Sequence, residues 1–198
     1  MSRPREFDDA VVLDAATDRF WRYGYAATSV RELCDAMGLM PASLYNAFGS
    51  KHALFARCLD RYLDGNMRER IARIETTCAP RAAIETFLNQ IVTRSLADPR
   101  GCLLVNSALE IAPHDAEVGA LIAERLGELR AFFHRSILAG QRDGSIAVTR
   151  RPSDLAALLL STVMGLRVLA RARSEPSLLR GAARQALALL DPPTGARA

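Results

Sequence analysis

Helical periodicity is the feature that most constrains this chain. Apolar residues recur at intervals of three and four along most of its 198 residues, and runs of β-branched residues are scarce. A helix-stopping proline, glycine or aspartate separates most of the periodic segments from the next. The sequence therefore predicts an all-α protein with about nine helices.

The first 80 residues predict two short helices and two longer ones. We expect a first helix over about 5–23, ending at Gly24, where a left-handed C-cap is favourable. Short helices follow over about 30–37 and 41–48, and a longer one over 51–76 is suited to bridging two domains. The side chains expected to pack inward from the first helix are Val11, Val12, Ala15, Ala16, Phe20 and, at its edge, Trp21.

The rest of the chain predicts five more amphipathic helices and a short tail. The tail, 191–198, contains Pro192, Pro193 and Gly195 and is expected to be disordered. We expect a small N-terminal domain over 1–50 and a larger helical domain over 51–190, in which 51–76 is the connecting helix. The five helices are expected over about 81–97, 103–112, 115–141, 153–172 and 176–190.

Composition excludes several classes of protein. Hydrophobic residues make up 49% and charged residues 24%, the balance of a soluble globular protein. No stretch approaches about 20 uninterrupted apolar residues, and the N-terminus lacks an apolar signal core, so we expect a cytoplasmic protein with no membrane partner. The four cysteines, Cys34, Cys58, Cys78 and Cys102, have no CxxC spacing and lie in a chain of intracellular character, so we expect reduced thiols with no metal site and no disulfides. We also expect no cofactor.

Bulk charge does not by itself indicate nucleic acid. The net charge is +4, but residues 1–70 hold ten basic and ten acidic residues, so the excess lies in the remainder. A prediction of DNA binding must therefore rest on a motif.

Residues 25–51 contain such a motif. Gly38 allows a sharp turn between two short helices whose apolar faces can meet around Leu39, and Thr28 or Ser29 offers a capping hydroxyl. The second helix begins at Pro41, and Ser50 can cap the helix that follows. The apolar faces consist of Val30, Leu33, Cys34 and Met37 in the first helix and of Leu44 and Phe48 in the second.

The second short helix has an outward face that fits the major groove of DNA. There Asn46 can bond adenine, small residues can meet a thymine methyl group, and hydroxyls can contact phosphates. A plain helical hairpin within an all-α core explains the same periodicity without DNA. The outward residues are Ala42, Ser43, Tyr45, Asn46 and Ala47.

This segment resembles the signature of the TetR/AcrR family of transcriptional regulators, most strongly over 7–62. The shared pattern is Thr-Ser-Val from residue 28, Gly-Leu at 38, Leu-Tyr-x-x-Phe from 44 and Ser-Lys-x-x-Leu-Phe from 50. Met40 and Cys34 depart from the family, which usually has serine and alanine there. We expect Cys34 to be a small core residue rather than a reactive thiol.

The resemblance implies a homodimeric repressor of double-stranded operator DNA that responds to a small-molecule effector. It assigns phosphate contacts to Thr28 or Ser29, Tyr45 and Lys51. The N-terminal arm with Arg3 and Arg5 either enters a minor groove or is merely solvated. The full set of expected DNA-binding residues is Thr28, Ser29, Pro41, Ala42, Ser43, Tyr45, Asn46 and Lys51.

The C-terminal part resembles the same family's effector-binding and dimerisation domain more loosely. Asn106 and Glu110 lie four residues apart and can orient a polar ligand group, although capping or surface pairing explains them equally well. Dimerisation is expected through the last two helices, by a face of Leu158, Leu159, Val163, Leu166, Leu187 and Leu190 with Gly165 allowing close approach. The residues expected to line the effector pocket are Phe87, Ile91, Cys102, Val105, Asn106, Leu109, Phe132, Phe133 and Met164.

Three other functions compete with this prediction. Cys102 stands at the start of a helix, where the backbone favours a thiolate, so it can instead sense an electrophile or oxidant. A helical dimer that binds proteins rather than DNA is a further alternative. An enzyme is not expected, because there is no phosphate loop, nucleophile elbow or HExxH, and the histidines are far apart in sequence: His52, His114 and His134.

Overall fold

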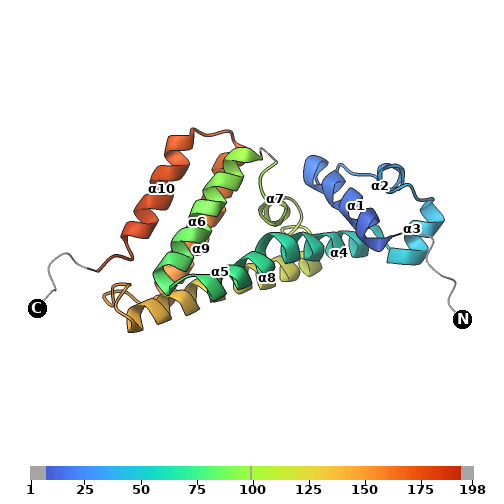
Figure 1. Ribbon diagram of the computed structural model, residues 1–198. Coiled ribbons are helices and arrows are strands. Elements are labelled where there is room, and N and C mark those ends of the chain that lie inside the picture. The colour runs from blue at the N-terminus through green and yellow to red at the C-terminus, as the bar shows by residue number, and fades with distance from the viewer. Residues whose placement is uncertain (1–7, 99, 193–198) are drawn as a thin grey trace, which may run out of the picture. The chain divides into compact units, whose positions relative to one another are not determined.

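The computed structural model of the chain describes residues 8–98 and 100–192. All regular structure in these residues is helical, which confirms the all-α prediction (Figure 1). Because α4, η1 and α5 follow one another without a break, these residues form nine continuous helices, as predicted. The elements are α1 (Asp9–Tyr23), α2 (Val30–Met37), α3 (Pro41–Phe48), α4 (Lys51–Leu63), the π-helical η1 (Asp64–Arg68), α5 (Glu69–Thr77), α6 (Pro80–Ala97), α7 (Leu103–Glu110), α8 (Ala116–Arg142), α9 (Pro152–Arg171) and α10 (Pro176–Ala188).

The chain packs as two compact units. The first, called the head unit, comprises Met1–Asn66 and Cys102–Ile122. The second, called the C-terminal unit, comprises Met67–Gly101 and Ala123–Ala198. α7 and the start of α8 therefore pack with the N-terminal helices, although they come after α6 in the sequence.

In the head unit, α1 differs in two ways from its expected form. The helix begins after Asp8, whose carboxylate accepts a hydrogen bond from the Ala10 N–H at 2.8 Å; the expected start near Arg5 lies outside the described residues. Val11 is 65% exposed, so its expected inward packing is wrong. The reason is the direction of the buried face, which follows Val12, Leu13, Ala16, Thr17 and Phe20.

Aromatic side chains join α1 to α4. The rings of Phe20 and Phe55 meet edge to face, with centroids 5.1 Å apart, and Trp21 meets Tyr62 in the same way at 4.9 Å. Phe20 and Phe55 are each 1% exposed, so this contact lies at the centre of the head-unit core. The two short helices α2 and α3 are built onto this pair.

The long helix predicted over 51–76 is continuous from Lys51 to Thr77, but it contains a π-helical segment that the sequence analysis did not predict. A π-helix shifts the hydrogen-bond register and leaves a carbonyl in need of a new donor. Within this segment the Asn66 side-chain amide donates to the Tyr62 carbonyl at 2.9 Å. The boundary between the two units falls at this segment, after Asn66.

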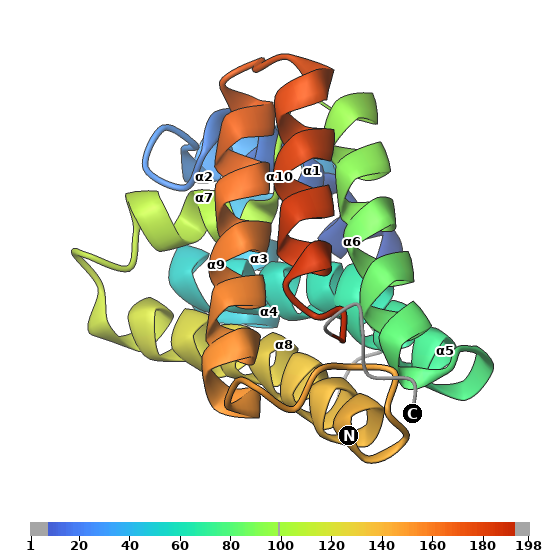
Figure 2. The same cartoon turned by 90° about the vertical axis from the view of Figure 1, so that its left-hand side faces the viewer.

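In the C-terminal unit, α6, α9 and α10 lie side by side (Figure 2). Arg167 of α9 is 8% exposed and donates to the Ser95 hydroxyl of α6 at 3.1 Å. Phe87 of α6 packs with Phe132 and Phe133 of α8, and the ring centroids lie 5.2 to 5.6 Å apart. These rings form the centre of the unit's core, because each is at most 1% exposed.

The apolar face expected to join two subunits is mostly buried inside one subunit. Leu158 is 41% exposed, but the other five side chains are at most 8% exposed. An amphipathic pattern shows that a face is buried but not what covers it, and here neighbouring helices of the same chain do so. The expected dimer contact is therefore wrong for five residues, which are buried within their own subunit: Leu159, Val163, Leu166, Leu187 and Leu190.

Among the described residues one helix, α9, is long and apolar enough to cross a membrane by length and composition alone. Several of its apolar side chains belong to the core of the C-terminal unit instead, among them Leu155 and Leu159. A core helix with a second apolar face accounts for the same composition.

The aromatic cluster of the C-terminal unit gives a stability prediction. Replacing Phe132 with alanine should lower the free energy of unfolding by about 3–5 kcal/mol, because it leaves a cavity beside Phe87 and Phe133. Urea unfolding followed by circular dichroism measures this. Val148→Ala is the control: because Val148 is 74% exposed, this substitution should change the free energy of unfolding by less than about 0.5 kcal/mol. A loss below about 1 kcal/mol for Phe132→Ala would contradict the assignment of this cluster to the core.

Candidate nucleic-acid interface

Local capping fixes where α2 begins and ends. The Ser29 hydroxyl oxygen accepts from the Glu32 N–H at 3.2 Å, and the Glu32 carboxylate accepts from the Ser29 N–H at 2.8 Å, which is a complete capping box. At the other end, Gly38 adopts the left-handed conformation, with φ 66° and ψ 30°. The turn between α2 and α3 is therefore built by a glycine suited to that conformation, as expected.

The apolar faces of α2 and α3 meet as the sequence predicted, with one exception. Leu33, Cys34 and Met37 of α2 and Leu44 and Phe48 of α3 are buried. Burial raises the pKa of the Cys34 thiol, as expected for a core residue. The exception is Val30, which is only half-buried.

α3 starts without a side-chain cap. Met40 occupies the N-cap position, makes no capping hydrogen bond and is 72% exposed. Pro41 at the first helical position needs no N–H partner and holds a helical φ, as expected. The departure from the family at Met40 therefore leaves the helix intact.

The outer face of α3 presents the expected set of side chains. Pro41, Ala42 and Asn46 are exposed, and Tyr45 is 49% exposed. Ser43 is half-buried. An asparagine, a tyrosine and small residues on one exposed helix can together reach base edges and phosphates in a major groove.

The two hydroxyls at the start of α2 differ in exposure. Thr28 is fully buried, and its hydroxyl donates to the Gly24 carbonyl at 2.6 Å. Ser29 is exposed. Of the two alternatives for a phosphate contact, Ser29 thus has the accessible hydroxyl, while Thr28 holds the turn that precedes α2.

Lys51 lies in the first turn of α4, after the Ser50 cap, whose hydroxyl oxygen accepts from the Ala53 N–H at 3.0 Å. The Lys51 Nζ lies 4.3 Å from the centroid of the Tyr25 ring, a cation–π contact. Burial lowers the pKa of Lys51, and the negative charges of Glu110 and Glu32 oppose that shift. Lys51 is thus a half-buried cation that packs on an aromatic ring and is subject to the negative charge of two carboxylates.

Ion pairs fix α1 against the motif and against α4. Arg19 of α1 pairs with Glu32 of α2, which also belongs to the capping box. Arg61 of α4 binds both carboxylate oxygens of Asp14, at 2.6 and 2.8 Å, and this hydrogen bonding lowers the pKa of Asp14. These contacts orient the helices without occupying the outer face of α3.

One residue of this site was assigned a different role by the sequence analysis. Glu110, at the end of α7, accepts hydrogen bonds from the N–H groups of Tyr25 at 3.2 Å and Ala26 at 2.8 Å. It was expected to orient a ligand together with Asn106 or to cap or pair at the surface. No local pattern reveals its actual partners, because they lie 85 and 84 residues earlier in the chain.

The nine residues expected to line an effector pocket fall into two groups. Phe87, Phe132 and Phe133 pack against one another in the C-terminal unit, where Ile91 is also buried and Met164 is half-buried. The remainder belong to the head unit: Cys102 and Asn106 are half-buried, Val105 is buried and Leu109 is exposed.

The inward orientation expected of Leu109 is wrong, because this side chain is 65% exposed. The buried face of α7 follows Leu103, Leu104 and Ser107, and Leu109 lies on the other side of the helix.

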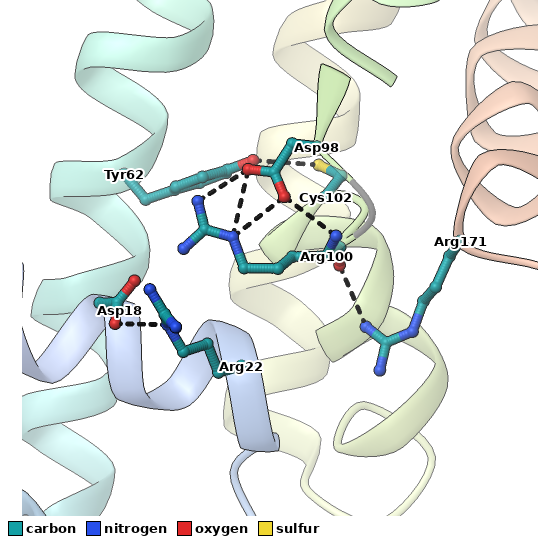
Figure 3. Close-up of polar contacts among 7 residues, drawn as sticks. All are labelled: Asp18, Arg22, Tyr62, Asp98, Arg100, Cys102 and Arg171. Carbon is teal, nitrogen blue, oxygen red and sulfur yellow. Dashed lines mark hydrogen bonds and ion pairs between the residues drawn. The ribbon is translucent and has the colours of Figure 1, made fainter. Parts of the chain in front are cut away.

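Cys102 is the N-cap residue of α7 (Figure 3). The Tyr62 hydroxyl donates to its Sγ at 3.6 Å. The preceding loop is fixed separately: Arg100 binds both carboxylate oxygens of Asp98, which lowers the pKa of Asp98, and Arg171 donates to the Arg100 carbonyl at 3.3 Å. Cys102 thus begins its helix directly after a loop that is held by ionic and hydrogen-bonded contacts.

Comparisons with known proteins agree with this geometry. Residues 12–58 match the family model "Bacterial regulatory proteins, tetR family", and residues 78–186 match "Tetracyclin repressor-like, C-terminal domain". YezE of Bacillus subtilis (strain 168), an uncharacterized HTH-type transcriptional regulator, is 29% identical over 197 residues, which cover 96% of this chain and 100% of that protein. The HTH-type transcriptional repressor ComR of Escherichia coli (strain K12) is 28% identical over 174 residues, covering 85% and 82%.

A solved structure is similar over the same extent. It contains a cysteine mutant of the TetR family transcriptional regulator CifR, complexed with 26bp double-strand operator DNA. This chain is 32% identical to it, with 96% of this chain and 100% of that chain covered and a TM-score of 0.84.

A capped helix-turn-helix with an exposed second helix, carried by an all-α chain, defines a DNA-binding transcriptional regulator. The chain belongs to the tetR family of bacterial regulatory proteins.

Two substitutions distinguish a phosphate contact from a base contact. Lys51→Ala should weaken binding to all duplex sequences about equally and reduce the salt dependence of the binding constant by about one counterion. Asn46→Ala should instead change base preference at a single position of each half-site. Fluorescence anisotropy over a salt series and a panel of single-base operator variants measures both effects.

The control for the loss of charge is Arg150→Ala, which removes an exposed cation from the C-terminal unit. The affinity of the Arg150→Ala variant for duplex DNA should stay close to that of the wild type. An Asn46→Ala protein with unchanged base preference would show that this residue does not contact a base edge.

Proposed function

We propose that this protein is a ligand-responsive repressor that binds a palindromic operator as a homodimer. The observation that carries the proposal is the outer face of α3, which exposes Ala42, Tyr45 and Asn46 on a helix fixed by its buried residues. Two such helices about 34 Å apart match successive major grooves on one side of a duplex. The relatives ComR and CifR, named as a repressor and as a regulator complexed with operator DNA, support the same assignment.

Each exposed residue of the motif has a proposed role. Tyr45, Ser29 and Lys51 contact phosphates, and Asn46 contacts a base edge. Ala42 and Ser43 approach the groove closely because their side chains are small. Pro41 sets the start of the helix, and Thr28 acts indirectly, through its bond to the Gly24 carbonyl.

We propose that the two domains expected from the sequence have separate functions. Residues 1–50 form the DNA-binding domain and 51–190 the effector-binding and dimerisation domain, with the helix from Lys51 to Thr77 connecting them. We place the protein in the cytoplasm, where its DNA is, and assign it no enzymatic activity, because its relatives are transcriptional regulators.

For the dimer we propose the exposed faces of α9 and α10. These faces carry apolar and small residues that the protomer leaves uncovered: Leu158, Val168 and Leu178 are 41 to 50% exposed. Apart from the adjacent residues and the helix's own backbone, no heavy atom lies within 4 Å of where a side chain would begin at Gly165 or Gly181, so a partner helix can approach closely there. Burial of such faces is the main driving force for association of helices.

For the effector we propose the aromatic core of the C-terminal unit, around Phe87, Phe132 and Phe133. A ligand that separates these rings favours a conformer in which the helix from Lys51 to Thr77 moves, and this lowers operator affinity. Such a population shift requires that the ligand bind the two conformers with different affinity.

A specific contact favours a second mode of control through Cys102. The thiol is half-buried rather than enclosed, and the Tyr62 hydroxyl donates a hydrogen bond to its Sγ at 3.6 Å. In this mode an electrophile or oxidant modifies Cys102, and the modified side chain displaces the N-terminal end of α7.

Thiol control predicts that Cys102→Ser keeps operator affinity when a mild oxidant is added, whereas the wild type loses it. Operator affinity before and after treatment with hydrogen peroxide measures the difference, and intact-protein mass spectrometry locates the modification. Cys58→Ser is the control, because Cys58 is fully buried and burial raises its pKa to about 12. Release of DNA by Cys102→Ser under the same treatment would exclude this mode.

The main proposal is tested by selection from random duplex DNA at near-physiological salt, followed by sequencing of the retained pool. We expect an enriched inverted repeat, with half-sites about one helical turn apart. A folded dimer that enriches no sequence would contradict the proposal and favour a helical interaction protein that does not bind DNA.

A further inference from the structure

We propose that Glu110 of α7 is a positioning residue for operator binding and that it acts through Lys51. This inference rests on the proposed role of Lys51 as a phosphate contact. The carboxylate binds two consecutive backbone N–H groups, of Tyr25 and Ala26, in the turn between α1 and α2. All of these residues belong to the head unit.

The turn is shaped to receive this carboxylate. Gly24 has a φ of 85°, which disfavours residues with a side chain. A Cβ at this position would lie 2.7 Å from Glu110 Oε2 and 2.9 Å from Oε1, closer than such atoms can approach. The backbone conformation favours glycine at 24, and a side chain there would displace the Glu110 carboxylate from the turn.

The bound turn carries the aromatic ring under Lys51. Glu110 fixes the Tyr25 backbone, the Tyr25 ring packs on Phe55 at 5.1 Å, and the Lys51 Nζ lies 4.3 Å from the ring centroid. The negative charge of Glu110 also acts directly on Lys51 and opposes the effect of burial on its pKa. Glu110 thus sets both the support and the electrostatic environment of this ammonium group.

The other parts of the motif do not depend on Glu110. Ser29 is held by its own capping box with Glu32, and Glu32 pairs with Arg19 of α1. The α2–α3 turn is held by Gly38 and by the buried apolar faces. Loss of Glu110 should therefore leave the helix-turn-helix folded and change chiefly the position of Lys51.

A second contact ties the same region to the first turn of α4. His52 Nε2 lies 3.1 Å from the Asp115 carboxylate, which also caps α8 by accepting from the Val118 N–H at 3.0 Å. The segment from α7 to α8 thus contacts Tyr25, whose ring packs on Lys51, and His52, which follows Lys51 in α4. A displacement of α7 along its axis would withdraw Glu110 from the turn and release Lys51 from its support.

The first test is operator affinity. Using the operator obtained by selection, we expect Glu110→Ala to weaken binding about tenfold and Glu110→Gln about threefold, because glutamine keeps one acceptor but loses the charge. Glu124→Gln is the matched control: it removes a carboxylate of α8 that belongs to the C-terminal unit and whose side chain is 65% exposed, and the operator affinity of this variant should change by less than about twofold. The melting temperature should change by less than about 3 °C in all three variants.

The second test separates a positioning role from a general structural one. In a double-mutant cycle, Glu110→Ala should have less than about a twofold effect once Lys51 is alanine. By reciprocity, operator binding should also slow amide hydrogen exchange in α7 of the wild type, and Glu110→Ala should abolish that slowing while protection of α2 and α3 remains.

Each outcome has a definite meaning. Wild-type affinity in Glu110→Ala and Glu110→Gln, or an undiminished effect of Glu110→Ala in the Lys51→Ala background, would overturn the role of Glu110 while leaving DNA binding established. A wild-type protein that binds no selected duplex would overturn the proposed function itself.

Discussion

The contact between α1 and α4 is the interaction on which the head unit depends. Phe20 and Phe55 meet at its centre, both almost fully buried, and Tyr25 packs against both rings. Because aromatic rings bury a large apolar area in a fixed geometry, this cluster defines the angle at which α1 meets α4. The short helices α2 and α3 are too small to fold alone and obtain their stability by packing on this pair.

Polar contacts then add what apolar packing does not specify, which is the position of individual functional groups. The Ser29–Glu32 capping box fixes the start of α2, and Glu110 fixes the turn before it. Charged acceptors bound to backbone N–H groups give stronger and more directional contacts than neutral ones. A DNA-binding surface needs such precision, because phosphates and base edges are recognised at hydrogen-bond distance.

The π-helical segment Asp64–Arg68 lies within the long helix at the residue where one compact unit ends and the other begins. Its irregular hydrogen bonding, with Asn66 satisfying the Tyr62 carbonyl, makes this the point at which the helix is least regular. A proposed motion of the connecting helix therefore has a local structural basis. The sequence Asp-Gly-Asn, poor in helix formers, is the only local sign of it.

The sequence by itself determined the helices and the motif. Helix ends followed from local chemistry: Ser29, Gly38, Pro41 and Ser50 act within a few residues of themselves, so their effects are visible in the chain. Only the tertiary structure decided which faces meet and which distant residues pair. Periodicity did not show that Val11 and Leu109 face outward or that Leu187 is buried within its own subunit. Nor did any local pattern connect Glu110 to Tyr25, because a contact across 85 residues depends on how whole helices pack.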